Sequence, residues 1–263
     1  MALTMPDWAR NAAYRVLHSL SGPGDSVSVI LLYHSLGTGI SSSLPLDRFE
    51  EQLELLAERF RVVRLDELRT ARASSPDANL AVITFDDGFL DNFEIALPAL
   101  ERYRVPATFF VATGYLGGRF RTSVGELPMM DAAQVKELSE RGHEIGAHTM
   151  THPKLTRMDP AAVRDEMRGS RDFLESALGK RVVSFAYPKG DYNTAVRNAA
   201  EEEGFQIAVT IEERLVDRDP DWLALPRVWI SNRLSAGAFR AKLSPAVGWY
   251  QDLSRRASRM SVG

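Results

Sequence analysis

Short apolar runs alternate along the chain with stretches in which apolar residues recur every three or four positions. The runs SVSVILLY at 26–33 and LAVITF at 80–85 predict strands, and the second has too few polar residues for a strand with one solvated face. Between them, Phe49, Leu53 and Leu56 recur at helical spacing. Further strands are predicted at 61–65, 107–112, 143–147, 182–186, 206–211 and 225–230, and further helices at 89–103, 131–142, 159–174 and 193–203.

This alternation predicts parallel strands with helices outside them. Seven or eight such units in 263 residues favour a barrel over an open sheet, so we expect an α/β fold, a (β/α) barrel in a single domain. The barrel is placed at 26–245, between an N-terminal helical extension at 1–25 and a C-terminal tail at 246–263. In such barrels the chemistry lies at the C-terminal ends of the strands.

Two segments carry patterns of their own. The stretch 113–130 is rich in glycine and is expected to be irregular, and loops of that length tend to be functional. On the N-terminal helix, Trp8, Ala12, Val16 and Leu20 form an apolar stripe. We expect the stripe to pack against its own domain. The alternative is contact with a membrane surface, near lipid-linked sugars.

Composition limits the chemistry that the barrel can carry. The chain has no cysteine, so a metal must be held by His, Asp or Glu. A net charge of −3 gives no case for a nucleic-acid partner. The longest apolar run, 27–33, is too short to span a bilayer, and the N-terminus lacks a secretory pattern. We therefore expect a cytoplasmic protein, with peripheral membrane contact left open.

Two motifs bring titratable side chains to predicted strand ends. Asp86 and Asp87 stand directly after the strand at 80–85, in TFDDG, and His148 and His152 follow a later strand in HTMTHP. Two imidazoles four residues apart can converge on one ion if the segment makes a helical turn. With one carboxylate they leave positions open for water and substrate. The alternatives are a simple turn at Asp-Gly and a pair of surface histidines.

The ordered set of motifs resembles the polysaccharide deacetylase family, also called the NodB-homology or carbohydrate esterase 4 group. The resemblance covers roughly residues 28–230. It implies a distorted (β/α)7 barrel and a metal-dependent hydrolase that removes acetyl groups from amino sugars. Besides TFDDG and HTMTHP, it rests on LYHS at 32–35, ATFF at 107–110, EIG at 144–146, FAYPKG at 185–190 and LPR at 225–227.

The resemblance also implies a role for each matching residue. Asp86 would be the general base, and Asp87, His148 and His152 would hold one divalent ion. Zinc is expected first, with cobalt, nickel, manganese or iron as alternatives. The family's usual acid, a late histidine, has no counterpart, because no histidine follows His152. His34, at the end of the first strand, is the expected replacement; the alternative is a histidine satisfied within the core.

The third motif departs from the family pattern. Many members carry R-x-P-Y, where this chain has AYPK at 186–189. Tyr187 and Pro188 are candidate substrate-binding residues. Lys189 is a candidate catalytic residue, whose backbone N–H could serve as oxyanion donor. Arg227 could take over the missing arginine's task of orienting the general base, or could form a surface ion pair instead.

The sequence therefore predicts an N-deacetylase acting on a polysaccharide, an oligosaccharide or a glycan precursor. One rival is a deacylase of a small soluble or nucleotide-linked amide, which the missing secretory pattern favours. Another is a catalytically silent glycan-binding protein of the same fold. The intact set of Asp86, Asp87, His148 and His152 argues against the silent protein, since a binding module has no need for a spare carboxylate beside the ion.

Overall fold

A computed structural model describes residues 6–20, 26–37, 43–122 and 125–260. Its strands are β1 (Ser28–Tyr33), β2 (Arg61–Val62), β3 (Leu80–Phe85), β4 (Thr108–Val111), β5 (Arg119–Thr122), β6 (Gly125–Pro128), β7 (Glu144–Ala147), β8 (Ser184–Ala186), β9 (Ile207–Val209) and β10 (Val228–Trp229). Its α-helices are α1 (Asp7–Leu20), α2 (Leu46–Arg59), α3 (Leu68–Ser74), α4 (Leu97–Tyr103), α5 (Ala132–Glu140), α6 (Pro160–Leu178), α7 (Thr194–Glu202), α8 (Ala236–Lys242) and α9 (Ala246–Met260).

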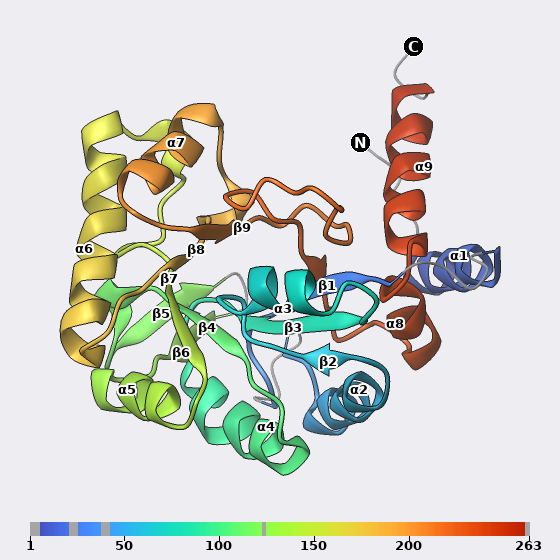
Figure 1. Cartoon of the computed structure of the whole chain (residues 1–263), viewed down its shortest axis with the longest axis horizontal. Coiled ribbons are helices and arrows are strands. Elements are labelled where there is room, and N and C mark those ends of the chain that lie inside the picture. Colours follow the sequence, from blue (N-terminus) through green and yellow to red (C-terminus); the bar gives the residue numbers. More distant parts are fainter. Residues whose placement is uncertain (1–5, 21–25, 38–42, 123–124, 261–263) are drawn as a thin grey trace.

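The main sheet is parallel and curled (Figure 1). Its strands run in the order β10-β1-β3-β4-β7-β8-β9, with β2 paired to β3, and each of these pairings is parallel. Helices α2, α4, α5, α6 and α7 lie around the outside of the sheet. The predicted single-domain α/β fold is confirmed, as a half-barrel whose two edges are β9 and β10.

The segment 225–229 spans the gap between the two edges of the sheet. Leu225 forms a parallel bridge with Val209 in β9, and β10 then pairs with β1. The strand predicted at 225–230 is thus divided between two neighbours. Arg227 lies between the two pairings, and its side chain is fully buried.

Apolar side chains fill the layer between sheet and helices. All six residues of β3 are buried, as the lack of polar positions predicts. Phe85 of β3 stacks on Phe109 of β4 with 5.0 Å between ring centroids, and Phe49 of α2 packs edge-on against Phe85. Leu53 and Leu56 are buried on the same helix, so the helical spacing marks the face that packs on the sheet.

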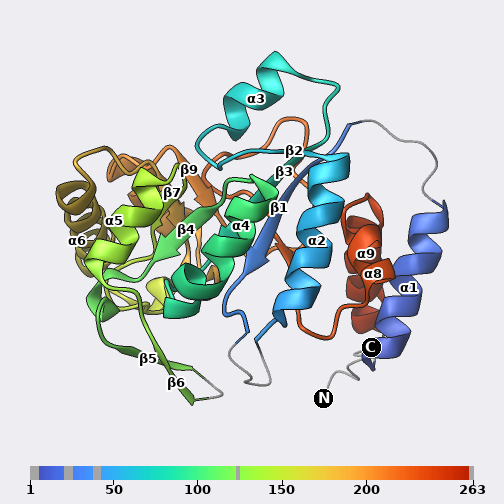
Figure 2. The same cartoon turned by 90° about the horizontal axis from the view of Figure 1, so that it is seen from below.

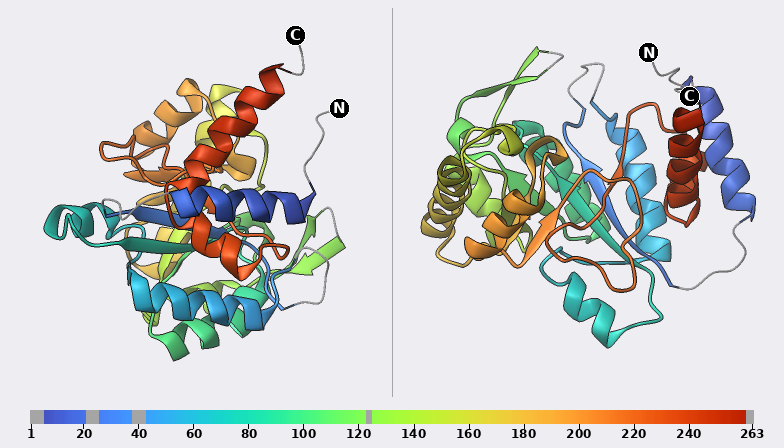
Figure 3. Two further views of the ribbon diagram at one scale, coloured as in Figure 1. Left: turned by 90° about the vertical axis from the view of Figure 1, so that its right-hand side faces the viewer. Right: turned by 90° about the horizontal axis from the view of Figure 1, so that it is seen from above.

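Both ends of the chain differ from the prediction. The expected tail at 246–263 is helical in α9, and α1 packs against α8 and α9 (Figure 3). The α1 contact is made by Tyr14, which is buried 4.4 Å from the ring of Tyr250. The prediction that the apolar stripe packs inward is therefore wrong: Trp8 and Val16 are 75% and 59% exposed. No helix of the described ranges is long and apolar enough to cross a membrane.

The stretch 113–130 contains more regular structure than expected. Strands β5 and β6 pair as an antiparallel hairpin. The hairpin projects beyond the C-terminal ends of the parallel strands, on the side opposite α3 (Figure 2). It therefore forms a wall beside the edge where the predicted chemistry lies.

Candidate metal centre

The predicted reactive residues meet at the C-terminal edge of the sheet. Asp86 and Asp87 directly follow β3, His148 directly follows β7 and His34 directly follows β1. His152 returns to the same place four residues after His148. The barrel rule that places chemistry at strand ends holds for all of these positions.

Asp87, His148 and His152 form a cluster with the spacing of a metal site. Each offers one ligand atom, and these atoms lie within 4.8 Å of one another. Nε2 of His148 is 3.5 Å and Nε2 of His152 is 3.4 Å from Oδ1 of Asp87. Two ligands of a tetrahedral ion, each about 2.1 Å from it, lie about 3.4 Å apart. The spacing therefore suits a shared ion better than direct hydrogen bonds.

A buried oxygen in this cluster lacks a donor. Oδ1 of Asp87 has no hydrogen-bond partner among the residues that the structure describes. A buried carboxylate oxygen is costly unless a donor or a cation satisfies it. Burial raises the pKa of Asp87, but the facing imidazoles outweigh burial and lower that pKa below its usual value. The carboxylate therefore stays ionised, as a metal ligand must.

The two imidazoles differ in their surroundings. Burial, assisted by the nearby charge of His148, lowers the pKa of His152 to about 4, so this ring is neutral near pH 7. Burial also disfavours charge on His148, but Asp87 and Asp86 outweigh it and raise the pKa of His148. Nδ1 of His148 lies 2.8 Å from the carbonyl oxygen of Ala186, which fixes the ring with Nε2 toward Asp87. An ionised carboxylate and two converging imidazoles fit a divalent ion.

The turn that carries the histidines is not helical, so the two rings converge without the helical turn that was considered for them. Thr149 and His152 have positive φ angles of 64° and 55°. Glu166, buried on α6, holds the turn, because its carboxylate accepts hydrogen bonds from the backbone N–H groups of Met150 and Thr151 at 2.8 and 2.9 Å. The imidazoles therefore converge through an irregular, anchored turn.

Unusual backbone geometry is concentrated at this site. In the described ranges, five residues other than glycine have positive φ, and four of them are Asp87, Thr149, His152 and Lys189. Such conformations are uncommon for residues with a Cβ. They persist where the surrounding structure enforces them, which is frequent at functional sites.

Asp86 is paired with Arg227 inside the barrel. Nη1 and Nη2 of Arg227 donate to the two carboxylate oxygens at 2.6 and 2.7 Å. The guanidinium also donates to the hydroxyl of Thr84 and the carbonyl of Thr210. Burial raises the pKa of Asp86, but the charge of Arg227 outweighs burial and brings that pKa to about 2. Because Arg227 is 0% exposed, the alternative of a surface ion pair is wrong.

His34 lies at the open side of the site. Its side chain is exposed, which excludes the alternative of a core histidine, and it lines the same cleft as Asp87 and His152. Its charge contributes to the lowered pKa of Asp87, so the ring lies near the ion site. Asn92 holds the loop by donating to the carbonyl oxygen of His34 at 2.8 Å, and Ser35 donates to buried Asp91 at 2.6 Å.

The third motif is only partly on the cleft surface. The phenol of Tyr187 is buried, donates to the carbonyl oxygen of Leu223 and stacks on Tyr192. Pro188 is buried as well. Lys189 is exposed and lines the cleft, so the structure brings this residue alone of the three to the surface that a substrate would meet. The burial of Tyr187 argues against contact between its side chain and a substrate.

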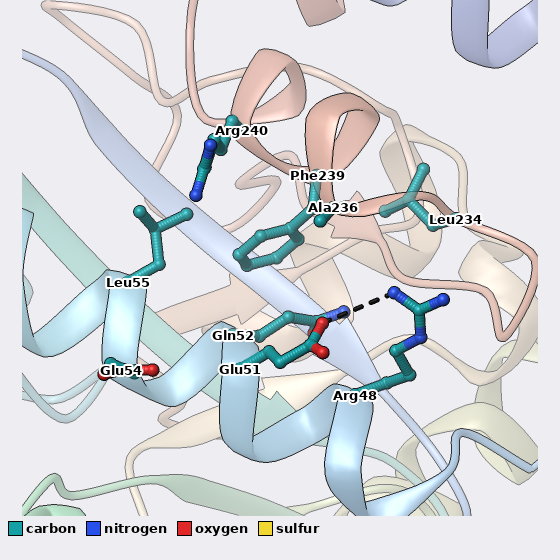
Figure 4. A pocket seen from close by; sticks show the side chains of 9 residues that line it. All are labelled: Arg48, Glu51, Gln52, Glu54, Leu55, Leu234, Ala236, Phe239 and Arg240. Carbon is teal, nitrogen blue, oxygen red and sulfur yellow. Dashed lines mark hydrogen bonds and ion pairs between the residues drawn. The ribbon is translucent and has the colours of Figure 1, made fainter.

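The cleft has a volume of about 750 Å³ and draws on distant parts of the chain. Besides the strand ends, α1 contributes Asp7 and Arg10, the β5–β6 hairpin contributes Phe120, and the loop after β10 contributes Arg233. A second hollow, of about 280 Å³, lies between α2 and α8 (Figure 4). None of the predicted site residues lines that second hollow.

Sequence reasoning missed the residues that support the site. Glu166 and Asn92 bind backbone groups of the loops that they hold, and Asp91 accepts a hydrogen bond from the hydroxyl of Ser35. Asp91 and Asn92 follow TFDDG by a few residues, and that proximity was a usable signal. Glu166 gives no such signal, because an acidic residue in a helix is normally solvated.

Comparison with known proteins agrees with this geometry. The model of the polysaccharide deacetylase family matches residues 73–208. YxkH of Bacillus subtilis strain 168 is 32% identical over 215 residues, which cover 81% of this chain and 74% of that protein. The chain belongs to the polysaccharide deacetylase family. A family model that spans half of the chain and a relative aligned over most of both chains carry this conclusion.

Further relatives of this polysaccharide deacetylase are more distant. The poly-beta-1,6-N-acetyl-D-glucosamine N-deacetylase of Staphylococcus epidermidis is 27% identical over 159 residues, so the chain spans 54% of that enzyme. The solved structure of the Streptococcus pyogenes deacetylase PplD, in complex with acetate, is 25% identical with a TM-score of 0.74, covering 84% of this chain and 100% of PplD. IcaB from Ammonifex degensii, 24% identical with a TM-score of 0.73 over 85% of this chain and 97% of its own, shares the fold.

Proposed function

We propose that this polysaccharide deacetylase is a metal-dependent N-deacetylase, which removes acetyl groups from amino sugars of a polysaccharide, an oligosaccharide or a glycan precursor. The proposal rests on an ion site, formed by Asp87, His148 and His152, beside a carboxylate, Asp86, that is held by Arg227. The named activity of the Staphylococcus epidermidis relative supports an N-acetyl substrate. The acetate bound to PplD supports release of an acetyl group.

Zinc is the ion that we propose for this site, since two imidazoles and one carboxylate are a frequent ligand set of catalytic zinc. The same ligands accept cobalt, nickel, manganese or iron. When bound, such an ion polarises the acetamide carbonyl and acidifies water. Asp87, His148 and His152 would hold it through the atoms that now face one another.

Asp86 is the proposed general base. With its pKa brought to about 2, it is ionised at neutral pH and can accept a proton from the attacking water. Arg227 binds both carboxylate oxygens and so holds the group in one orientation. This agrees with the proposal that Arg227 takes the place of the arginine missing from the third motif.

The amine must be protonated as it leaves, and His34 is the proposed acid. Its ring is exposed at the cleft near the ion site, where it can reach a substrate. Lys189 is proposed to supply a backbone N–H to the oxyanion. Its position in the cleft lining and the contribution of its charge to the lowered pKa of His152 support this proposal. Tyr187 and Pro188 are proposed to shape the wall under Lys189.

The test is release of acetate from N-acetylated oligosaccharides. A chelator should stop the release, and zinc or cobalt should restore it. The Asp86→Asn variant should retain its metal, measured by mass spectrometry, and lose activity by about 10²-fold or more. Asp131→Asn is the matched control, because asparagine caps a helix as well as the aspartate that caps α5. Binding of glycans without any acetate release would overturn the proposal in favour of a silent binding protein.

A further inference from the structure

Positive charge gathers along the cleft, although the chain carries a net charge of −3. Two carboxylates line the cleft, Asp7 and Asp87, and the second belongs to the ion site. Charge of one sign in a cleft with low-dielectric walls raises the local concentration of ligands of the opposite sign. The cationic side chains that line the cleft, apart from histidines, are Arg10, Arg121, Lys189 and Arg233.

Two of these four cations have other partners or roles. Arg121, on the β5–β6 hairpin, donates from Nε and Nη2 to one carboxylate oxygen of Glu126, at 3.2 and 2.9 Å. Arg119 of the same hairpin also lies 3.9 Å from Glu126, so this cationic group belongs to the hairpin. Lys189 lies beside the ion site and belongs to the proposed acetyl-transfer machinery. Arg10 and Arg233 therefore remain as a separate cationic feature of the cleft.

Arg10 and Arg233 share a single carboxylate. Nη2 of Arg10 lies 2.5 Å from Oδ1 of Asp7, and Nη1 of Arg233 lies 3.2 Å from Oδ2 of the same side chain. The cluster therefore carries one positive charge in excess. A guanidinium has five N–H donors, so both arginines keep donors for a ligand. The two arginine side chains are 31% and 70% exposed, which leaves them accessible from the cleft.

The cluster joins two elements that are far apart in the sequence. Asp7 and Arg10 come from the first turn of α1, whereas Arg233 comes from the loop after β10. Asn11 of α1 also donates to the carbonyl oxygen of Arg233 at 3.3 Å. Helix α1 is itself packed on α8 and α9 (Figure 3). Tertiary contacts thus hold the two arginines in the lining of the cleft, and α1, which carries Arg10, lies well apart from the β5–β6 hairpin (Figure 2).

We propose that Arg10 and Arg233 form a subsite for an anionic group, a phosphate or a carboxylate, that the glycan substrate carries on a sugar other than the one being deacetylated. The inference rests on the proposed function and narrows its substrate class to acidic glycans. Planar guanidinium groups bind phosphate and carboxylate oxygens through paired hydrogen bonds, which gives them a preference for such groups. Because both arginines line the same cleft as Asp87, one oligosaccharide can reach both places.

Three matched substrates test this subsite. They are tri-N-acetylchitotriose, the same trisaccharide with a reducing-end phosphate, and its aldonic acid, which carries a carboxylate. The metal-loaded wild-type enzyme should deacetylate one or both anionic forms with a kcat/KM about tenfold or more above the neutral form. This preference should shrink as ionic strength rises. Comparison of the phosphorylated trisaccharide with the aldonic acid shows whether the subsite binds a phosphate or a carboxylate.

Substitution of both arginines tests whether they cause the preference for anionic trisaccharides. In Arg10→Gln/Arg233→Gln the ratio of kcat/KM for the anionic and neutral trisaccharides should fall below about twofold, because the charge-assisted bonds to the anion are lost. Arg10→Lys/Arg233→Lys should retain part of it and guards against a loss caused by unfolding. Arg240→Gln is the control, since Arg240 lines the hollow between α2 and α8 and not the cleft (Figure 4). Equal use of all three substrates by the wild type, or a preference that survives in the glutamine variant, overturns the subsite.

A measurement of substrate binding tests the anionic subsite independently of the proposed deacetylase activity. Calorimetric titration of the Asp86→Asn protein with the same trisaccharides needs no turnover. Tighter binding of an anionic form that is lost in Arg10→Gln/Arg233→Gln supports the subsite even if no acetate is ever released. Equal binding of the neutral and anionic forms contradicts the subsite while leaving the deacetylase proposal standing.

Discussion

His34 is exposed and His143 is buried, and each histidine leads to a different prediction at the scale of single residues. His34 is exposed in the cleft, where a substrate can reach it. His143 is 4% exposed, and its Nδ1 accepts a hydrogen bond from the backbone N–H of Ala107 at 3.1 Å. The first ring is placed for chemistry, whereas the second supports the start of β7.

Replacement of His34 should affect the two classes of acetyl substrate unequally. His34→Ala should slow amide cleavage by about 10²-fold, because the amine leaves poorly without an acid. Cleavage of 4-nitrophenyl acetate should change much less, since that leaving group needs no proton. The measurement is kcat on both substrates, with His18→Ala on α1 as control. Equal losses on amide and ester would count against His34 as the acid.

His143 should make stability depend on pH. Burial lowers the pKa of His143 to about 4, whereas an unfolded chain has a histidine pKa of about 6.5. Above pH 6.5 the ring is neutral in both states. Between pH 6.5 and 4 only the unfolded chain takes up the proton, so the free energy of unfolding decreases as the pH falls. The total loss is about 3 kcal/mol by pH 4.

Urea unfolding of the wild type and of His143→Gln at pH 7, 5.5 and 4.5 measures this contribution. The variant has no imidazole to protonate, so the wild type should lose more stability than the variant as the pH falls. Parallel pH dependences in the two proteins would show that His143 contributes nothing in this window.

At the scale of elements, the turn from 148 to 152 depends on α6. The carboxylate of Glu166 binds two backbone N–H groups and the hydroxyl of Thr151, so the turn is fixed from outside by a helix that supplies no metal ligand. Partners of this kind, one contact removed from the ion, set the orientation of the ligands. The positive φ angles of Thr149 and His152 are maintained by these bonds.

Glu166→Gln should therefore weaken metal binding. The amide oxygen can still accept from the N–H groups of Met150 and Thr151, but these charge-assisted bonds become weaker neutral ones, and we expect a loss of about tenfold in metal affinity. Zinc affinity is measured by competition with a chelating dye. Glu175→Gln is a matched control on the same helix, because Glu175 accepts a backbone N–H from Val182 far from the ion site. Unchanged affinity in Glu166→Gln would mean that the turn holds its shape without this anchor.

At the scale of the whole molecule, the ion site joins two parts of the barrel. Asp87 follows β3 and the histidines follow β7, with β4 lying between these strands in the sheet. An ion that binds all three side chains binds the folded chain and not the unfolded one. Occupancy of the site is therefore linked to the stability of the whole domain.

Removal of metal should lower the melting temperature of the wild type. At a free zinc concentration 1,000 times Kd, the stabilisation is about 4 kcal/mol. Thermal unfolding followed by circular dichroism, with and without a chelator, measures the difference. Asp87→Asn should show little response to zinc, because one of the three ligands is lost. If the wild type has the same melting temperature with and without the chelator, that result would contradict a resident ion at Asp87, His148 and His152.

The order of strands and helices and the position of the reactive motifs could be read from the sequence, because both depend on local spacing. A buried strand such as β3 is apolar in every residue, and TFDDG directly after it places Asp86 and Asp87 at the strand end. The parallel α/β architecture was therefore predictable, although a full barrel was expected, and the family resemblance pointed to Asp87, His148 and His152 as the ligand set. The shape of the turn that carries the histidines was not predictable, since a two-histidine spacing does not distinguish a helix from an anchored irregular turn.

Contacts between distant segments were decided by the tertiary structure. Arg227 could be a surface residue or a buried partner of Asp86, and only the path of segment 225–229 across the gap in the sheet places it inside. The same holds for Glu166, and for α1, whose Trp8 and Val16 face solvent while Tyr14 packs inward. Periodicity along a chain reports which face of an element is apolar. Which neighbour covers that face depends on how the sheet curls, and that is a property of the whole fold.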